Sequence, residues 1–172
     1  MRLQTTVWRA HNPRWAFAPT SGTGAARHGG RFNRVGLAAL YTSMRFETAW
    51  LEAQQAFPFK AQPMTICGYN VDCEDIADLC EPAAREALGI AYADLACPWE
   101  YLADSGQEPP SWAMSDACIT RGLAGAVVPS FASGATAADR NVVFWSWADA
   151  PPRKVKVIDD TGRLPRNDAS WR

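Results

Sequence analysis

The feature that most restricts how this chain can fold is a long run of turn-forming residues near its start. Residues 11–36 are rich in Gly, Ser, Pro and Asn, and they follow a short extended segment at 5–9. A run of this length is too long for a simple connection in a compact domain, and such loops commonly bind or cover something. It combines glycines with arginines, at Gly22, Gly24, Gly29, Gly30, Arg14, Arg27, Arg31 and Arg34. We therefore look here first for a functional site.

The rest of the chain alternates short predicted strands and helices in an irregular order. Apolar runs bounded by turn residues predict strands at 37–43, 64–71, 125–128, 141–147 and 154–158. Helices are predicted at 46–57, 83–88, 99–103 and 111–121. Because no repeat or linker divides the chain, we expect one α+β domain over residues 1–172, with an extended tail from about residue 160. Its core should be a mixed or mainly antiparallel sheet with flanking helices.

The helix predicted at 46–57 places a carboxylate beside an apolar stripe. The stripe consists of Phe46, Ala49, Trp50, Ala53 and Phe57. Glu52 lies about 60° from Ala49 around the helix, at the rim of this face. Tyr41 ends the preceding strand, so Tyr41 and Glu52 can face one cleft that Arg31 reaches from the loop. The alternatives are a solvated glutamate and a tyrosine at the edge of the core.

Charge is unevenly distributed, although the net charge is only −1. Residues 1–50 contain seven arginines and one acid, residues 51–120 contain twelve acids and two bases, and residues 121–172 contain eight bases and five acids. Arginine binds phosphate oxygens through a planar fork of donors. The basic segment therefore indicates either a phosphate-bearing partner, small molecule or nucleic acid, or a surface that pairs with the acidic middle of the chain.

The cysteines and the apolar residues restrict the cellular setting. The five cysteines form no Cys-x-x-Cys pair and the chain has only two histidines, so neither a disulfide framework nor a metal site is expected. Such cysteines are usually small buried residues, and a Cys–His nucleophile is the alternative. No apolar run reaches the roughly 18 residues of a membrane span, and residues 1–6 do not resemble a secretory signal. We expect a cytoplasmic protein without a membrane segment.

Two local patterns suggest binding chemistry. Residues 21–27 lack both the dinucleotide fingerprint and the Gly-Lys-Ser/Thr of a P-loop. In residues 28–33, two glycines precede Arg31 and Asn33, which suits a pyrophosphate or, alternatively, a tight turn with an exposed arginine. Ser130 follows an apolar strand but has no Gly-x-Ser-x-Gly elbow, so it reads as a hydrogen-bonding residue or a turn residue rather than a hydrolase nucleophile.

In their order and spacing these segments resemble the RES domain toxins, which are encoded beside Xre-like antitoxins in bacterial toxin–antitoxin pairs. The resemblance covers most of the chain and rests on residues 7–9, 22–25, 29–33, 36, 41–43, 49–52, 129–130 and 141–143. The arginine, glutamate and serine that name the family match Arg31, Glu52 and Ser130. Phe32 departs from the pattern, because the family usually has tryptophan at this position, but the polar set is intact.

The resemblance implies a fold similar to that of ADP-ribosyltransferases and a toxin that consumes NAD by cleaving the nicotinamide–ribose bond. Glu52 would then stabilise the cationic sugar, and Arg31 would hold the pyrophosphate or adjacent ribose. Tyr41 would stack on the nicotinamide, and Ser130 would orient the glutamate or a ribose hydroxyl. Ser133 is the alternative to Ser130. Further candidates for the same pocket are Arg9, Asn33 and Ser43.

The resemblance leaves the acceptor of the ADP-ribosyl group open. Water would define a glycohydrolase, phosphate a phosphorylase, and a protein side chain a transferase. The implied partner is an Xre-like antitoxin that blocks the pocket and provides the only link to nucleic acid. The competing interpretation is a nucleic-acid-binding or RNA-cleaving protein that uses the arginine-rich loop. The sequence pI of about 6.1 argues against it, since domains that bind phosphodiester backbones are usually basic overall.

Overall fold

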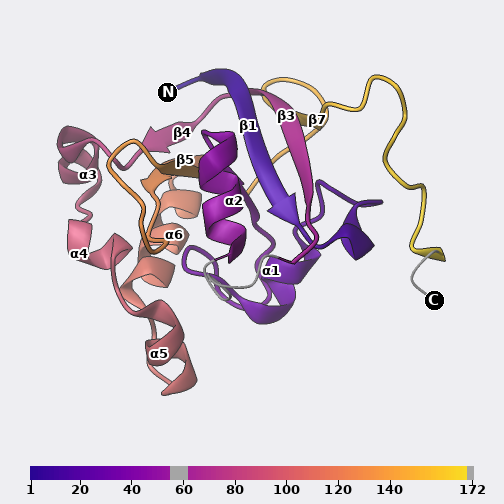
Figure 1. Cartoon of the computed structure of the whole chain (residues 1–172). Coiled ribbons are helices and arrows are strands. Elements are labelled where there is room, and N and C mark those ends of the chain that lie inside the picture. The colour runs from indigo at the N-terminus through magenta and orange to yellow at the C-terminus, as the bar shows by residue number, and fades with distance from the viewer. Residues whose placement is uncertain (55–61, 170–172) are drawn as a thin grey trace.

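The computed structural model describes residues 1–54 and 62–169, which form one mixed sheet of seven strands with six α-helices (Figure 1). The strands are β1 (Leu3–His11), β2 (Leu40–Ser43), β3 (Thr65–Cys73), β4 (Ile76–Asp78), β5 (Gly125–Pro129), β6 (Arg140–Phe144) and β7 (Arg153–Val157). Their order is β4-β5-β6-β2-β1-β3-β7, and every neighbouring pair is antiparallel except β4 with β5. The predicted α+β class with a mainly antiparallel sheet is confirmed.

The helices are α1 (Thr23–His28), α2 (Phe46–Gln54), α3 (Pro82–Leu88), α4 (Tyr92–Leu95), α5 (Trp99–Asp104) and α6 (Pro110–Thr120), with a 3₁₀ turn η1 at Pro13–Trp15. Every predicted strand and helix occurs, with ends shifted by at most three residues; residues 55–57, expected to continue α2, lie outside the described residues. The sequence pattern did not predict η1, α1, β4 or α4. Each of these elements is short. η1 and α1 also bury no residue, so hydrophobic periodicity gives no signal for these two.

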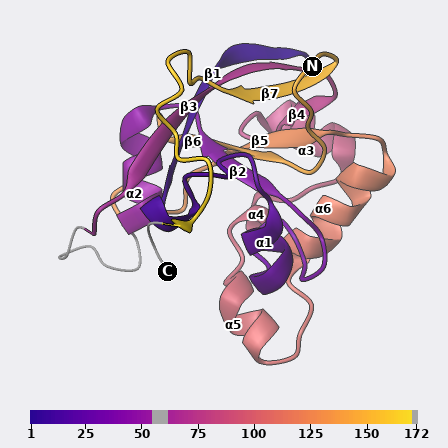
Figure 2. The same ribbon diagram turned by 90° about the vertical axis from the view of Figure 1, so that its right-hand side faces the viewer.

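The central strands are buried on both faces because an apolar core lies on each side of the sheet. Along β6, Val142 and Phe144 belong to one core cluster, whereas Val143 belongs to the other. This is the two-residue alternation of an extended chain. The second cluster also contains Leu95 of α4 and Met114 of α6, so these helices cover its face. Figure 2 shows α4 and α6 on one side of β2 in the view and α2 on the other.

α2 packs against the sheet through small and polar residues rather than through the expected aromatic stripe. Its buried residues are Thr48, Ala49 and Gln54. Phe46 and Trp50 of the expected stripe are 50% and 37% exposed, so they do not pack into the core, and Phe57 lies outside the described residues. The Thr48 hydroxyl donates a 2.6 Å hydrogen bond to the Asp139 carboxylate. This contact with the loop before β6 helps fix which face of α2 meets the sheet.

Four of the seven arginines in the first fifty residues form two kinds of contact, ion pairs with carboxylates and hydrogen bonds to main-chain carbonyls. Arg2 forms an ion pair with Asp72 at 2.6 Å, and Arg34 contacts Glu108 at 2.7 Å. Pairing with the acidic middle of the chain therefore holds for these two arginines. Arg9 and Arg31 instead donate to main-chain carbonyls, and they lie beside the cavities described below.

All five cysteines are free thiols, and all except Cys80 are buried. Burial raises the pKa of Cys73, Cys80 and Cys118 to about 11, so these side chains stay protonated at neutral pH. Cys67 lies 3.6 Å from His11, but burial raises the pKa of its thiol as well, which disfavours a nucleophilic thiolate. The expectation of small buried cysteines is confirmed. In the part of the chain that the structure describes, no helix is long and apolar enough to cross a membrane.

Candidate active site

The carboxylate of Glu52 is held by two side chains that come from distant parts of the chain. The Ser130 hydroxyl donates to Glu52 Oε1 at 2.6 Å, and Asn141 Nδ2 donates to the same oxygen at 2.5 Å. Glu52 lies on α2, Ser130 directly follows β5, and Asn141 is on β6. Hydrogen bonds to a charged acceptor are shorter and stronger than those between neutral groups. These two bonds therefore fix the direction in which the carboxylate faces.

Asn141 is itself oriented by a second hydrogen bond. Ser43 Oγ donates to Asn141 Oδ1 at 2.7 Å, and the two residues are paired in the register of β2 with β6. An amide whose oxygen accepts from Ser43 presents its nitrogen to Glu52, because that arrangement satisfies both partners. Ser43 thus acts on the carboxylate through Asn141. Ser43 was predicted to lie in the pocket, whereas no role was predicted for Asn141.

Ser130 is positioned by the loop between β5 and β6. Its N–H donates to the Asp139 carbonyl at 2.8 Å, and its hydroxyl oxygen accepts from the Ala132 N–H at 3.3 Å. The hydroxyl therefore has both an anchor in its own loop and the Glu52 carboxylate as acceptor. Ser133, the alternative candidate, is exposed farther along the same loop. The described contact to Glu52 is made by Ser130.

The Arg31 guanidinium is held by hydrogen bonds on the helical side of the cleft. It donates to the Cys97 carbonyl at 2.5 Å and to the Leu95 carbonyl at 3.3 Å. The same group lies 4.6 Å from the ring centroid of Phe131, a cation–π geometry. Burial lowers the pKa of Arg31, and the nearby Cys97 and Glu52 act against that shift. An arginine stays charged through such a shift, so the cleft wall carries a fixed positive charge.

Tyr41 and Asn33 hold the glycine turn in place. The Tyr41 hydroxyl donates to Asn33 Oδ1 at 2.7 Å and accepts from the Phe32 N–H at 2.9 Å. A Cβ on Gly30 would lie 2.7 Å from this hydroxyl oxygen, so only glycine fits there. Burial raises the pKa of Tyr41 far above its ordinary value, which keeps the hydroxyl protonated as a donor.

Asn33 is placed differently from the sequence prediction. It is 0% exposed and lines none of the described cavities. Its amide nitrogen donates to three carbonyls, those of Ala25, Arg34 and Leu37. The hydrogen bonds of the Asn33 side chain therefore hold the loop, because main-chain carbonyls in a buried turn need donors. Asn33 therefore stabilises the loop that lines the pocket and does not line the pocket itself.

Arg9 reaches the same cleft from β1. Its NH1 nitrogen donates to the carbonyls of Pro19 at 3.0 Å and Ser21 at 3.1 Å. The Tyr69 hydroxyl donates to the Pro19 carbonyl at 2.7 Å. Burial lowers the pKa of Arg9, and Tyr69 partly offsets that shift. Two side chains therefore anchor one loop segment, and one of them brings a second cation to the cleft.

Two adjoining cavities meet at the Glu52 carboxylate. Their volumes are about 250 and about 400 Å³. Both are lined by Arg9, Tyr41, Glu52 and Asn141. The larger extends along the glycine turn to Arg31, and Trp99 of α5 also lines it. A carboxylate between two arginines suits an organic ligand that carries anionic groups and a centre that becomes positive during reaction.

The structure brings most of the predicted site residues together. Five of them line the two cavities: Arg9, Arg31, Tyr41, Ser43 and Glu52. The other two, Ser130 and Asn33, hydrogen-bond with residues that line them. Asn141 was missed because its role depends on the pairing of β2 with β6, which residue spacing does not reveal. Trp99 and Phe131 were missed for a similar reason, since hydrophobic patterns do not distinguish a cavity wall from a core.

Residues 6–167 match the RES domain family. This match spans nearly the whole chain, so the chain belongs to the RES domain family, as the resemblance of its segments indicated.

A solved structure with the same fold is a chain in the crystal structure of the M. tuberculosis MbcT–MbcA toxin–antitoxin complex. The TM-score is 0.64 at 21% sequence identity, and the alignment covers 92% of this chain and 84% of the other. At this identity the likeness establishes the shared fold. A comparison with curated proteins gives no match.

Proposed function

We propose that this chain is the toxin of a bacterial toxin–antitoxin pair and that it consumes NAD by cleaving the bond between nicotinamide and ribose. The observation that carries the proposal is the Glu52 carboxylate, held by Ser130 and Asn141 where two cavities meet. Membership of the RES domain family and the fold shared with a chain of a toxin–antitoxin complex support it. NAD is the substrate, and the proposed chemistry uses no metal ion.

The charge of Glu52 suits this reaction. When the C1′–N bond of NAD breaks, its electron pair leaves with nicotinamide, which departs as a neutral molecule, and the ribose becomes an oxocarbenium-like cation. A fixed carboxylate stabilises that positive charge without having to reorganise during the reaction. An acceptor oxygen then bonds to C1′ and loses its proton. Ser130 and Asn141 serve the step by keeping the carboxylate aimed at the sugar.

The cleft walls suit the rest of the dinucleotide. Arg31 and Arg9 place positive charge on the walls of the 400 Å³ cavity, where a pyrophosphate can accept their hydrogen bonds. The Tyr41 ring lines both cavities, so it can flank the nicotinamide while its hydroxyl holds the glycine turn. Substrate binding and loop integrity are therefore coupled at this tyrosine.

The acceptor and the partner complete the proposal. Water, phosphate and a protein side chain share the same cleavage step, so product analysis has to identify which of them takes the ADP-ribosyl group. We further propose a cytoplasmic setting and an Xre-like antitoxin that covers the cleft. A purified toxin–antitoxin complex should then cleave NAD more slowly than the free toxin, and cleavage at the full rate of the free toxin would exclude this mode of inhibition.

The decisive experiment measures NAD turnover by the purified chain in buffer alone, with added phosphate, and with cell lysate. Glu52→Gln keeps the shape of the side chain but removes its charge. We expect kcat to fall about 10²- to 10³-fold, the usual effect of removing one group that stabilises transition-state charge. The product formed beside nicotinamide, whether ADP-ribose, its phosphate or a modified protein, identifies the acceptor.

The matched control is Glu47→Gln, which neutralises an exposed glutamate on the same helix. It should cleave NAD at the wild-type rate. If the folded wild-type chain leaves NAD intact under all three conditions, the proposal is wrong. Nucleic-acid binding, the competing interpretation of the arginine-rich loop, is then the next activity to measure.

A further inference from the structure

A third cavity, which we call the loop cavity, opens beside the proposed active site. Its volume is about 480 Å³, larger than either cavity at Glu52. It is lined by residues of β1 and of the 11–28 segment, among them Arg9, Trp15, Phe17, Gly24, Arg27 and His28. Arg9 and Gly24 also line the 400 Å³ cavity. The loop cavity is therefore adjacent to the site at which we place NAD cleavage.

One wall of the loop cavity is built from a main-chain segment that three side chains hold. Arg9 donates to the Pro19 and Ser21 carbonyls, and Tyr69 donates to that of Pro19. The Trp147 Nε1–H donates to the Thr20 carbonyl at 3.1 Å. Three consecutive carbonyls are thus satisfied from outside the loop. A segment held in this way is preformed, so a ligand would not bear the entropic cost of ordering it.

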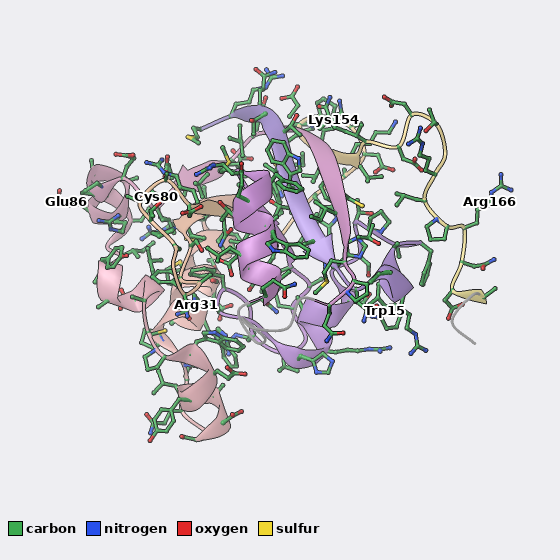
Figure 3. The ribbon with its side chains drawn as sticks, viewed as in Figure 1. Trp15, Arg31, Cys80, Glu86, Lys154 and Arg166 are labelled. Atoms are coloured by element: carbon green, nitrogen blue, oxygen red, sulfur yellow. The ribbon has the colours of Figure 1, made fainter. Side chains whose placement is uncertain are left out.

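The aromatic residues of the loop cavity contribute little to the core. Trp15 is 50% exposed, and η1, to which it belongs, buries no residue. The ring centroids of Trp15 and Phe17 lie 6.3 Å apart at an angle of 45°. Figure 3 shows Trp15 on the side of β1 and β3, well apart from Arg31 on the side of the helices. The Arg14 guanidinium lies 5.3 Å from the centroid of the Trp15 ring. An exposed tryptophan on a cavity wall offers a surface on which a planar ring can stack.

Two arginines line the loop cavity. Arg27 occupies the last turn of α1, and Arg9 lines both the loop cavity and the 400 Å³ cavity. Among the residues that the structure describes, Arg27 forms no ion pair. Its charge is therefore available to a ligand, in contrast to that of Arg2 or Arg34.

We propose that the loop cavity binds the adenylate half of NAD, an inference that rests on the proposed function. NAD consists of two nucleotides joined by a pyrophosphate. With the nicotinamide–ribose bond at Glu52, the pyrophosphate lies near Arg9, and the adenosine enters the loop cavity, where the base stacks on Trp15. Arg27 contributes to the charge that holds the phosphates. No covalent step occurs in this cavity, so its contribution is to affinity.

The test uses AMP as the probe, because AMP carries the base and phosphate without the bond that is cleaved. Calorimetry measures AMP binding to the wild-type chain, to Glu52→Gln and to the double variant Trp15→Ala, Arg27→Ala. Loss of one base–aromatic stack alone weakens binding about tenfold. We expect at least that loss in the double variant and none in Glu52→Gln. The matched control, Arg166→Ala, removes an exposed arginine outside the loop cavity.

Steady-state NAD kinetics separate this inference from the proposed function. The double variant should raise KM for NAD about tenfold and leave kcat within about twofold, because the ring stack adds affinity and no chemistry. AMP should compete with NAD. Equal AMP affinity in wild type and double variant, no AMP binding, or AMP binding that does not compete with NAD overturns the subsite even if NAD is cleaved. A wild-type chain that binds AMP but cleaves no NAD overturns the proposed function instead.

Discussion

The floor and the wall of the cleft are held together in different ways: the floor by hydrogen bonds between side chains, the wall mainly by hydrogen bonds to main-chain groups. The floor, which consists of Ser43, Glu52, Ser130 and Asn141, is joined by hydrogen bonds between residues 78, 89 and 98 positions apart. The loop wall, residues 11–36, is held mainly by hydrogen bonds from side chains to main-chain groups, with partners both near and far in the sequence. Tyr69, Trp112, Trp145 and Trp147 donate to its carbonyls from 50 to 127 positions away. Asn33 bonds with residues no more than eight positions away, and Arg9 bonds with residues 10 and 12 positions away.

This difference separates two kinds of dependence on the fold. The floor exists only when β2, β5 and β6 are paired and α2 is docked, because β2, β6 and α2 each contribute one of its side chains and Ser130 directly follows β5. The wall is a loop whose main-chain groups are satisfied by its own side chains and by side chains that reach it from distant parts of the chain. Changes in the floor should therefore alter chemistry with little loss of stability, whereas changes in the wall should alter stability first.

The largest effect should come from Asn33→Ala in the loop wall. This substitution removes a fully buried amide and leaves the carbonyls of Ala25 and Leu37 without their donors. The free energy of unfolding should fall by about 2–4 kcal/mol, as measured by urea denaturation. Asn167→Ala, at an exposed asparagine, is the control. A loss below about 0.5 kcal/mol, typical of surface substitutions, would show that the loop is held by other contacts.

In the floor, Asn141→Ala should lower kcat for NAD cleavage about 10- to 100-fold, because hydrogen bonds to charged groups are worth more than neutral ones. KM and the unfolding free energy should change little. Steady-state kinetics and urea denaturation on the same preparation test both statements. Asn70→Ala, an exposed strand asparagine, controls for the substitution itself. A raised KM with normal kcat would mean that Asn141 binds substrate rather than positioning Glu52.

A smaller loss should follow from Ser130→Ala, about tenfold in kcat, because a water molecule can take the place of the small hydroxyl. Ser133→Ala in the same loop should behave like wild type, since Ser133 is exposed and the described contact to Glu52 comes from Ser130. Parallel NAD assays of the two variants decide between the two candidate serines. The opposite ranking would transfer the role to Ser133.

The smallest effect concerns the protonation of His11 beside the loop wall. Burial lowers the pKa of His11, with a contribution from Arg9, so the folded chain binds this proton less readily than the unfolded chain does. The stability that neutral His11 contributes is complete above the unfolded pKa of about 6.5 and declines as the pH falls below it. The unfolding free energy should therefore decrease between about pH 7 and pH 5. His11→Gln should reduce this slope; an equal slope in the variant and the wild type would contradict the assignment.

The sequence alone identified most elements of the fold because apolar periodicity is a local signal. It predicted strands β1 to β3 and β5 to β7 and helices α2, α3, α5 and α6, with ends within a few residues of the observed ones. It failed for the face of α2, where Phe46 and Trp50 are exposed and Thr48 is buried. Hydrophobicity does not reveal a polar anchor such as the bond from Thr48 to Asp139.

For the site, the sequence determined the family, through the order and spacing of its arginine, glutamate and serine segments, and it indicated that the loop rich in glycine and arginine matters. Only the tertiary structure decided what each side chain does. In the folded chain Asn33 holds the loop, and Asn141 donates a hydrogen bond to Glu52. The physical reason is that hydrogen bonds depend on the distance and angle between atoms, and for residues some 90 positions apart these are set by strand pairing and helix docking.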